Sequence, residues 1–200
     1  MTPDPAYYLV IDLEATCERG GALPPKETEI IEIGAVLVRA GTFEAEGEFQ
    51  TFVRPVAHPR LTAFCTELTS ITQADVDRAP TFPAALAALR AFLGGRDALF
   101  CSWGEYDRNQ LKRDAHRHRA SLPFGGRHLN LKALFSEALG ESERFGMAGA
   151  LRRVGLPLEG THHRGIDDAR NIAKLLPYAL GVAKAKPRGR SWEREGRQPG

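Results

Sequence analysis

The stretch YYLVIDLEATCERG (residues 7–20) carries two acids, Asp12 and Glu14, at the end of an apolar run. The run is rich in Val, Ile and Leu and is followed by turn formers, which is typical of a β-strand over residues 7–13. Because side chains alternate along a strand, Asp12 and Glu14 project from the same face. Two carboxylates held that close repel each other unless a cation lies between them. The pair is therefore either a chance feature of a surface strand or half of a metal site.

Two more strands are predicted directly after this stretch. IIEIGAVLV (residues 30–38) is a continuous apolar run, and FEAEGEFQTFVRP (residues 43–55) alternates until its final proline. Three successive strands favour an antiparallel or mixed meander. Helical spacing begins with TFPAALAALRAFLGG, in which Leu86, Leu89 and Leu93 share one face and two glycines end the helix.

The remainder of the chain is mostly helical in pattern. DALFCSW reads as one more strand, over residues 97–103. The helical patterns are YDRNQLKRDAHRHR (106–119), LNLKALFSEALG (129–140), MAGALRRVG (147–155) and DDARNIAKLLPYALG (167–181). The order β-β-β-α-β-α-α-α predicts an α/β fold, a mixed β-sheet flanked by helices on its faces.

The composition is that of a soluble globular protein, with 42% hydrophobic and 26% charged residues in a chain of 200. We expect one folded domain over residues 1–183 and a disordered basic tail over residues 184–200, which is too polar to form a core. No stretch has the roughly 18 apolar residues of a membrane span. The start, MTPDPAYY, lacks the pattern of a signal peptide, and three widely spaced cysteines favour a reducing compartment. We therefore expect a cytoplasmic protein with no membrane segment.

Further acids lie where later strands end or later helices begin. Asp107 follows a predicted strand and opens a helix. The motif HHRGIDDARNIA places His162 and His163 in a loop, and Asp167 and Asp168 in the first turn of a helix. Acids at a helix start can simply cap free N–H groups and favour the helix dipole, but only one of these two is needed for that. Two His–Asp pairs are each five residues apart, so spacing alone leaves the register open.

In combination, these motifs resemble those of the DEDDh 3′-to-5′ exonucleases. The resemblance is carried, in order, by IDLEATC, EIIEIGAVLV, FVRP, LTAFCTELTSITQADVDRAPTFPAAL, YDRNQL and HRGIDDARNIAKLL. It covers about Tyr7 to Ala179. The most similar branch is that of the histone-mRNA 3′-end exonucleases, which enhance RNA interference, and their bacterial sporulation-inhibitor relatives. The resemblance implies an RNase H-like, DnaQ-like exonuclease fold and the removal of nucleotides from a 3′ end.

Residue by residue, the resemblance implies roles for the acids and one histidine. Four acids become the metal ligands: Asp12, Glu14, Asp107 and Asp168. In the third motif of this family a histidine stands five residues before the aspartate, and Gly followed by an apolar residue precedes the double Asp. Only His163 with Asp168 fits that register. His163 then becomes the general base and Glu14 the second catalytic residue, while His162 is left as a loop residue and Asp167 as a helix cap.

The cofactors implied are two Mg²⁺ or Mn²⁺ ions, which prefer oxygen ligands. The implied reaction releases nucleoside 5′-monophosphates from the 3′ ends of single-stranded nucleic acid, with RNA favoured. A histidine suits the role of base because its ordinary pKa is about 6.5. A DNA exonuclease of the proofreading or repair type would share all of these residues. The alternative from another class is a nucleic-acid-binding module without catalysis. No protein partner is implied.

The resemblance also implies contacts with the terminal nucleotide. The backbone at Ala15 and Thr16 is expected to approach it, together with His163. Phe64 and Tyr106 stand where the family places aromatic rings near the terminal base. Stacking of a base on such a ring is worth about 1–3 kcal/mol and tolerates any base. Phe64 is equally suited to packing in the core.

Overall fold

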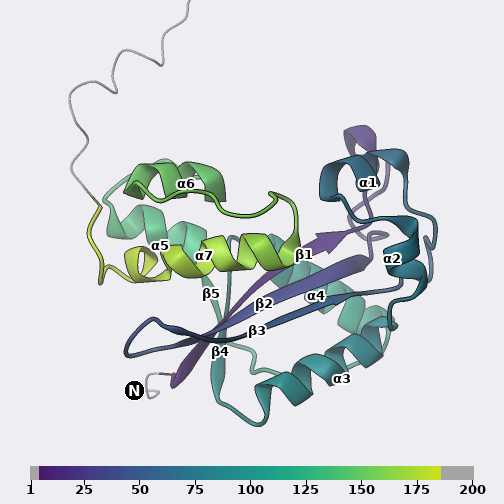
Figure 1. Ribbon diagram of the computed structural model, residues 1–200, viewed down its shortest axis with the longest axis horizontal. Coiled ribbons are helices and arrows are strands. Elements are labelled where there is room, and N and C mark those ends of the chain that lie inside the picture. The colour runs from purple at the N-terminus through teal and green to yellow at the C-terminus, as the bar shows by residue number, and fades with distance from the viewer. Residues whose placement is uncertain (1–4, 186–200) are drawn as a thin grey trace, which may run out of the picture.

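The structure, a computed structural model, describes residues 5–185. One mixed sheet has helices on both faces (Figure 1). Its strands are β1 (Tyr7–Ala15), β2 (Ile30–Arg39), β3 (Ala45–Phe52), β4 (Ala98–Ser102) and β5 (His128–Asn130). The helices are α1 (Ala63–Thr69), α2 (Gln73–Asp77), α3 (Phe82–Leu93), α4 (Tyr106–Arg117), α5 (Leu131–Ala138), α6 (Met147–Val154) and α7 (Gly165–Ala179), with a short 3₁₀ turn at Arg19–Gly21.

Strand β1 lies in the middle of the sheet, whose order is β3-β2-β1-β4-β5. Strand β2 runs antiparallel to both β1 and β3, so the predicted meander is confirmed. Strands β4 and β5 run parallel to β1 and β4, respectively. The carboxyl ends of β1 and β4 therefore lie at the same edge of the sheet, where side chains that follow the two strands can meet.

The sheet has a hydrophobic core on each face, and successive side chains of β1 point alternately into one and the other. Leu9, Ile11 and Leu13 belong to the core that the sheet forms with α3 and α4. Val10 belongs to the opposite core, formed with α5, α6 and α7. Since Asp12 has the same parity as Val10, it faces the α7 side of the sheet. The expectation that the acids of this stretch share a face is borne out by their position on β1.

The helices predicted from residue 81 onward are present as α3, α4, α5, α6 and α7. Two short helices, α1 and α2, and the strand β5 were not predicted. Thr62 caps α1 by accepting a hydrogen bond from the Cys65 amide. Thr72 and Asp75 form a capping box at the start of α2. These caps stabilise helices too short to show a clear apolar period.

The ends of the chain are only partly covered by the structure. Of the predicted basic tail, residues 184–200, the part from 186 onward lies outside the described residues, so the division at 183 stays a prediction. Within residues 5–185, no helix has both the length and the apolar character required to cross a membrane.

Candidate active site

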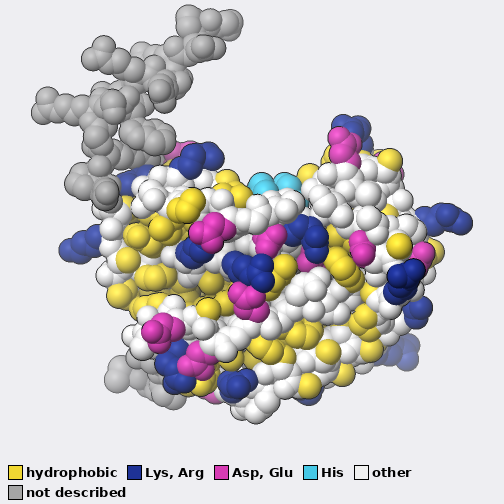
Figure 2. Space-filling view, viewed as in Figure 1, with side chains coloured by type: hydrophobic (Ala, Val, Ile, Leu, Met, Phe, Trp, Pro, Cys, Tyr) yellow, Lys and Arg dark blue, Asp and Glu magenta, His cyan; other side chains and the backbone are white. Residues whose placement is uncertain are grey.

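Four acids from three elements line one cavity of about 400 Å³ at the carboxyl end of β1. Asp12 and Glu14 come from β1, Asp107 from the first turn of α4 and Asp168 from the first turn of α7. Figure 2 shows histidine side chains beside a hollow in the outline of the molecule, between α1 and the helices α5–α7. The structure thus brings together the four acids that the sequence predicted as metal ligands.

The carboxylates lie close to one another. Ligand oxygens of Asp12, Glu14 and Asp168 are all within 4.8 Å. Asp107 is held beside them because its Oδ1 accepts a hydrogen bond of 3.1 Å from the Leu13 amide. This bond ties the first turn of α4 to the backbone between the two acids of β1.

Close packing between two glycines brings α7 onto the acids of β1. Gly34 on β2 is paired with Asp12, and a Cβ atom placed on Gly34 would lie 2.1 Å from the carbonyl carbon of Gly165. A Cβ on Gly165 would in turn lie 3.0 Å from the Asp12 carbonyl oxygen. Since the two backbones touch without side chains between them, the first turn of α7 reaches the face of β1 that carries the acids. Asp168 follows in that turn.

The electrostatics of the cluster favour a bound cation. Burial, followed by the charges of Asp107 and Glu14, raises the pKa of Asp12 well above its ordinary value. Burial and Asp168 raise the pKa of Glu14 from 4.5 to about 8, and burial raises that of Asp107 to about 7. Burial also raises the pKa of Asp168, against the opposing effect of His162. Buried acids that repel one another in this way are stabilised in the charged form by a cation.

Both histidines of the third motif contact Asp168. His162 Nδ1 lies 2.9 Å from Asp168 Oδ2, and the imidazole is 44% exposed. The backbone amide of His163 donates to the same oxygen at 3.1 Å, and its ring stacks on that of His162 with 4.1 Å between centroids. Burial, followed by the charge of His162, lowers the pKa of His163. Both rings line the cavity. His163 suits a general base because its lowered pKa keeps the ring neutral near pH 7, whereas His162 Nδ1 already contacts the Asp168 carboxylate.

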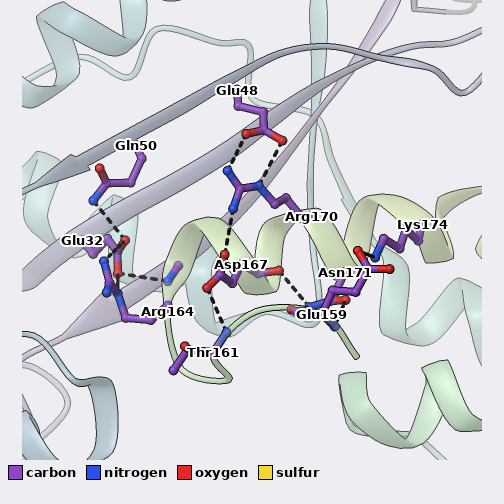
Figure 3. Close-up of polar contacts among 11 residues, drawn as sticks. Glu32, Glu48, Gln50, Glu159, Thr161, Arg164, Asp167, Arg170, Asn171 and Lys174 are labelled. Atoms are coloured by element: carbon purple, nitrogen blue, oxygen red, sulfur yellow. Dashed lines mark hydrogen bonds and ion pairs between the residues drawn. The ribbon is translucent and has the colours of Figure 1, made fainter. Parts of the chain in front are cut away.

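The expectation that Asp167 caps α7 is wrong. The N-cap residue is Arg164, whose own side chain makes no capping hydrogen bond. Asp167 Oδ2 instead accepts a hydrogen bond of 2.9 Å from the Thr161 amide, and Oδ1 accepts one of 2.8 Å from Arg170 (Figure 3). Asp167 therefore holds the loop before the helix, and it does not line the cavity of the four acids.

The residues expected to touch the substrate are only partly brought together. Ala15, Tyr106 and His163 line the acid cavity, and Tyr106 is 51% exposed. Thr16 is buried, and its amide and hydroxyl are both bonded to the backbone of Glu29. It lines a neighbouring cavity of about 240 Å³. Phe64 is absent from the lining of both cavities, and its ring lies under the Arg19 guanidinium at 4.9 Å.

Several lining residues were missed by the sequence analysis. Trp103 lines the cavity, with its indole N–H held by the Phe145 carbonyl at 3.0 Å. Its position at the end of a strand pattern, four residues before Asp107, was a usable signal. Leu68 of α1 and Met147 of α6 also line the cavity. Nothing in their local sequence separates them from ordinary core residues, because their place depends on how the helices pack.

The donor set fits hard divalent cations. All four acids offer carboxylate oxygens, the ligands that Mg²⁺ and Mn²⁺ prefer. Burial, followed by the neighbouring carboxylates, raises the pKa of Asp12 and Glu14, and a bound cation would offset both effects. His162, His163 and Asp168 form a second group of ligand atoms within 4.8 Å, contiguous with the first.

Comparison with known proteins agrees with the fold and this site. Residues 9–176 match the family described as RNase_T exonuclease. The chain belongs to this exonuclease family. Over 180 residues it is 34% identical to the protein of Mus musculus named ERI1 exoribonuclease 3, a match that covers 85% of this chain and 52% of that protein. The chain spans about half the length of the first curated relatives that it matches.

Solved structures of similar fold also belong to exonucleases. The nuclease domain of 3′hExo, described as a DEDDh family member bound to rAMP, superposes with a TM-score of 0.80 at 30% identity and covers 92% of this chain and 98% of that one. A 3′-exonuclease described with a histone mRNA stem-loop gives a TM-score of 0.81 at 29% identity, covering 88% of this chain and 64% of that one. The RNase H-like α/β fold and the resemblance to DEDDh exonucleases are thereby confirmed.

Proposed function

We propose that this chain is a metal-dependent 3′-to-5′ exonuclease that releases nucleoside 5′-monophosphates from RNA 3′ ends. The observation that carries the proposal is the convergence of Asp12, Glu14, Asp107 and Asp168 on one cavity that His163 also lines. Membership of the exonuclease family supports it.

The four acids would hold two divalent cations, Mg²⁺ or Mn²⁺. Asp12 is the proposed shared ligand because the charges of the other three acids, Asp107, Glu14 and Asp168, all raise its pKa. When bound, such cations neutralise phosphodiester charge, lower the pKa of water and stabilise a leaving oxygen. Glu14 is both a ligand and a catalytic residue in this proposal.

His163 acts as the general base. Its imidazole takes the proton of the attacking water, and burial keeps the ring neutral near pH 7. His162 differs because its Nδ1 already lies at hydrogen-bonding distance from Asp168. The released proton therefore goes to the histidine whose ring is free to receive it.

The substrate is a single-stranded 3′ end, with RNA favoured over DNA. The names of the relatives, exoribonucleases, and the rAMP bound to one of the solved structures support RNA. Ala15 and Tyr106 line the cavity and would contact the terminal nucleotide, with the exposed Tyr106 ring stacking on its base. Thr16 would contribute from the neighbouring cavity, whereas Phe64, whose ring lies against Arg19, would contribute little. We place the enzyme in the cytoplasm, which suits the three free thiols of Cys17, Cys65 and Cys101.

The test is release of nucleotides from labelled single- and double-stranded RNA and DNA, with Mn²⁺ or Mg²⁺ and with a chelator. We expect nucleoside 5′-monophosphates from single-stranded RNA. D12N should lower the rate by more than about 100-fold, because a shared ligand is lost. E48Q is the matched control, since Glu48 is an exposed acid bonded to Arg170. Faster release from DNA would favour a proofreading or repair enzyme, and metal-independent binding without release would favour an inert binding module.

A further inference from the structure

A fifth acid, Glu32, lies beside the cluster and is not one of its ligands. It is the direct partner of Glu14 in the pairing of β1 with β2, so its side chain also faces α7. Its exposure is 0%, in a strand whose other residues from Ile30 to Val38 are apolar or glycine. A charged group in such a position must be paired, because an isolated buried charge is strongly unfavourable.

The carboxylate of Glu32 is filled by protein donors (Figure 3). Its Oε1 accepts from Gln50 Nε2 at 3.1 Å and from an Arg164 terminal nitrogen at 3.3 Å. Its Oε2 accepts from Arg164 Nε at 3.1 Å and from the Gly165 amide at 3.0 Å. A carboxylate has about four lone-pair positions, so little capacity remains for a cation. Glu32 therefore differs in role from its neighbour Glu14.

The donors that fill Glu32 belong to the start of α7. Arg164 is the capping residue of this helix, and Gly165 is its first residue. The Arg164 guanidinium is also held against the Phe52 ring, 5.2 Å from its centroid. One buried carboxylate on β2 thus fixes both the backbone and the side chain at the point where α7 meets the sheet.

The backbone of His163 lies between two fixed points, its own hydrogen bond to Asp168 and the bonds of the next two residues to Glu32. Its φ is +63°, a left-handed conformation that is uncommon for a residue other than glycine. Such a backbone persists where its surroundings fix it. On one side, the His163 amide is bonded to Asp168 Oδ2. On the other side, the next two residues, Arg164 and Gly165, are bonded to Glu32.

We propose that Glu32 is a positioning residue that, through Arg164 and the Gly165 amide, fixes the left-handed backbone of His163 and so places its imidazole in the cavity. The proposal rests on the proposed function, in which His163 is the base. In this proposal Glu32 contacts neither substrate nor cation and acts on His163 through the backbone of the third motif. Its charge also raises the pKa of Asp12 and Glu14, so R164K, which keeps that charge, separates positioning from this electrostatic effect.

E32Q tests this proposal. Glutamine keeps the shape of the side chain but replaces an acceptor oxygen by a donor nitrogen, which faces donors already present. We expect kcat to fall by about 10- to 100-fold, as for residues that orient catalytic groups, with KM within about threefold of wild type. A second measurement follows the His163 C2 proton by NMR in the metal-free protein, assigned by its loss in H163A. E32Q should shift this resonance.

E48Q is the matched control. Glu48 joins β3 to the same helix through two bonds to Arg170, of 3.0 and 2.6 Å, but these are exposed and lie farther along α7. We expect E48Q to keep kcat within about twofold and to leave the His163 resonance in place. A purely structural role for Glu32 would lower the melting temperature in E32Q while leaving kcat below that temperature and the resonance unchanged. That outcome would overturn the proposal.

R164K covers the case in which E32Q does not fold. Lysine keeps the positive charge beside Glu32 but loses the planar group that binds both oxygens. We expect an intermediate loss of kcat, about 3- to 10-fold, and a smaller shift of the His163 resonance. R164K with wild-type kcat and resonance would overturn the proposal. Failure of the proposed function is seen separately, as wild-type protein that releases no nucleotide with Mn²⁺, and the NMR measurement then still decides whether Glu32 places His163.

Discussion

Replacing Glu14 by glutamine should stabilise the metal-free protein at alkaline pH. Burial and the charge of Asp168 raise the pKa of Glu14 in the folded chain from 4.5 to about 8. A group whose folded pKa is raised contributes stability that is complete below its unfolded pKa and is lost as pH rises through the folded pKa. For Glu14 this window extends from about pH 4.5 to about pH 8. Glutamine has no proton to lose, so E14Q lacks this pH dependence.

The size of the effect follows from the shift. Each unit of pH between the two pKa values costs about 1.4 kcal/mol of folding free energy, because the unfolded Glu14 is ionised while the folded one is protonated. Between about pH 5.5 and pH 8 the loss from Glu14 comes to about 3 kcal/mol. Glu14 is 8% exposed, so solvent screening removes little of this. For a domain of this size the loss corresponds to roughly 6–12 °C in melting temperature.

The assay is thermal unfolding of chelator-treated wild type and E14Q across this range of pH. The difference between the two proteins reports Glu14 together with the effect of its charge on Asp12. The contribution of His163 cancels, because Glu14 is not among the groups that shift its pKa. We expect the melting temperature of E14Q to gain on wild type as pH rises, and Mn²⁺ to reverse the order by stabilising wild type more. The melting temperature of E48Q should change with pH as that of wild type does. In wild type the hydrogen bond from Arg170 lowers the pKa of Glu48, so Glu48 stays ionised over the whole range. Parallel curves for wild type and E14Q would refute the reasoning.

Two further predictions concern the roles of individual side chains. H163A should lower the rate of nucleotide release by about 100-fold or more and H162A by less than about tenfold, because only the first removes the base; the reverse order would assign the base to His162. Y106A should raise KM for single-stranded RNA about tenfold through lost stacking. F64A should change KM by less than about twofold, because its ring lies on Arg19 outside the cavity; equal effects of the two would place Phe64 at the substrate.

Strands and helices whose apolar residues recur at a regular spacing were predictable from the sequence. The short helices α1 and α2, which depend on their capping residues, were not. The apolar run of β2 and the helical spacing in α3 each bury a continuous set of side chains, which the pattern displays directly. Helix α1 has seven residues and α2 five, too few to establish a period of 3.6. Their caps were present in the sequence, as Thr62 and as Thr72 with Asp75. A search for caps before periods would have located both helices.

The acids of the site were predictable for local reasons, and the register of the histidines was not. Asp12 and Glu14 share a face by alternation, and Asp107 starts a helix after a strand, so their convergence follows from topology. His162 and His163 are neighbours in a loop, and each reaches Asp168 with a different atom. The choice between them depends on a left-handed φ at a residue other than glycine. Backbone conformation of this kind is imposed by tertiary contacts and leaves no mark in the spacing.

Glu14 and Glu32 show why an acid at a site does not reveal its role from sequence. They are paired across β1 and β2 and face the same helix, in strands of similar composition. Burial and the facing carboxyl of Asp168 raise the pKa of Glu14, and no N–H donor among the described residues is bonded to its oxygens, so they remain open to a cation. Glu32 meets donors from Arg164, which is 132 residues away in the sequence, and these fill its oxygens. Whether N–H donors from distant segments reach its oxygens thus decides whether a buried acid can bind a cation, as proposed for Glu14, or holds the backbone, as Glu32 does. A lone acid within a buried apolar strand therefore predicts a distant cationic partner, and here that partner adjoins the proposed catalytic histidine.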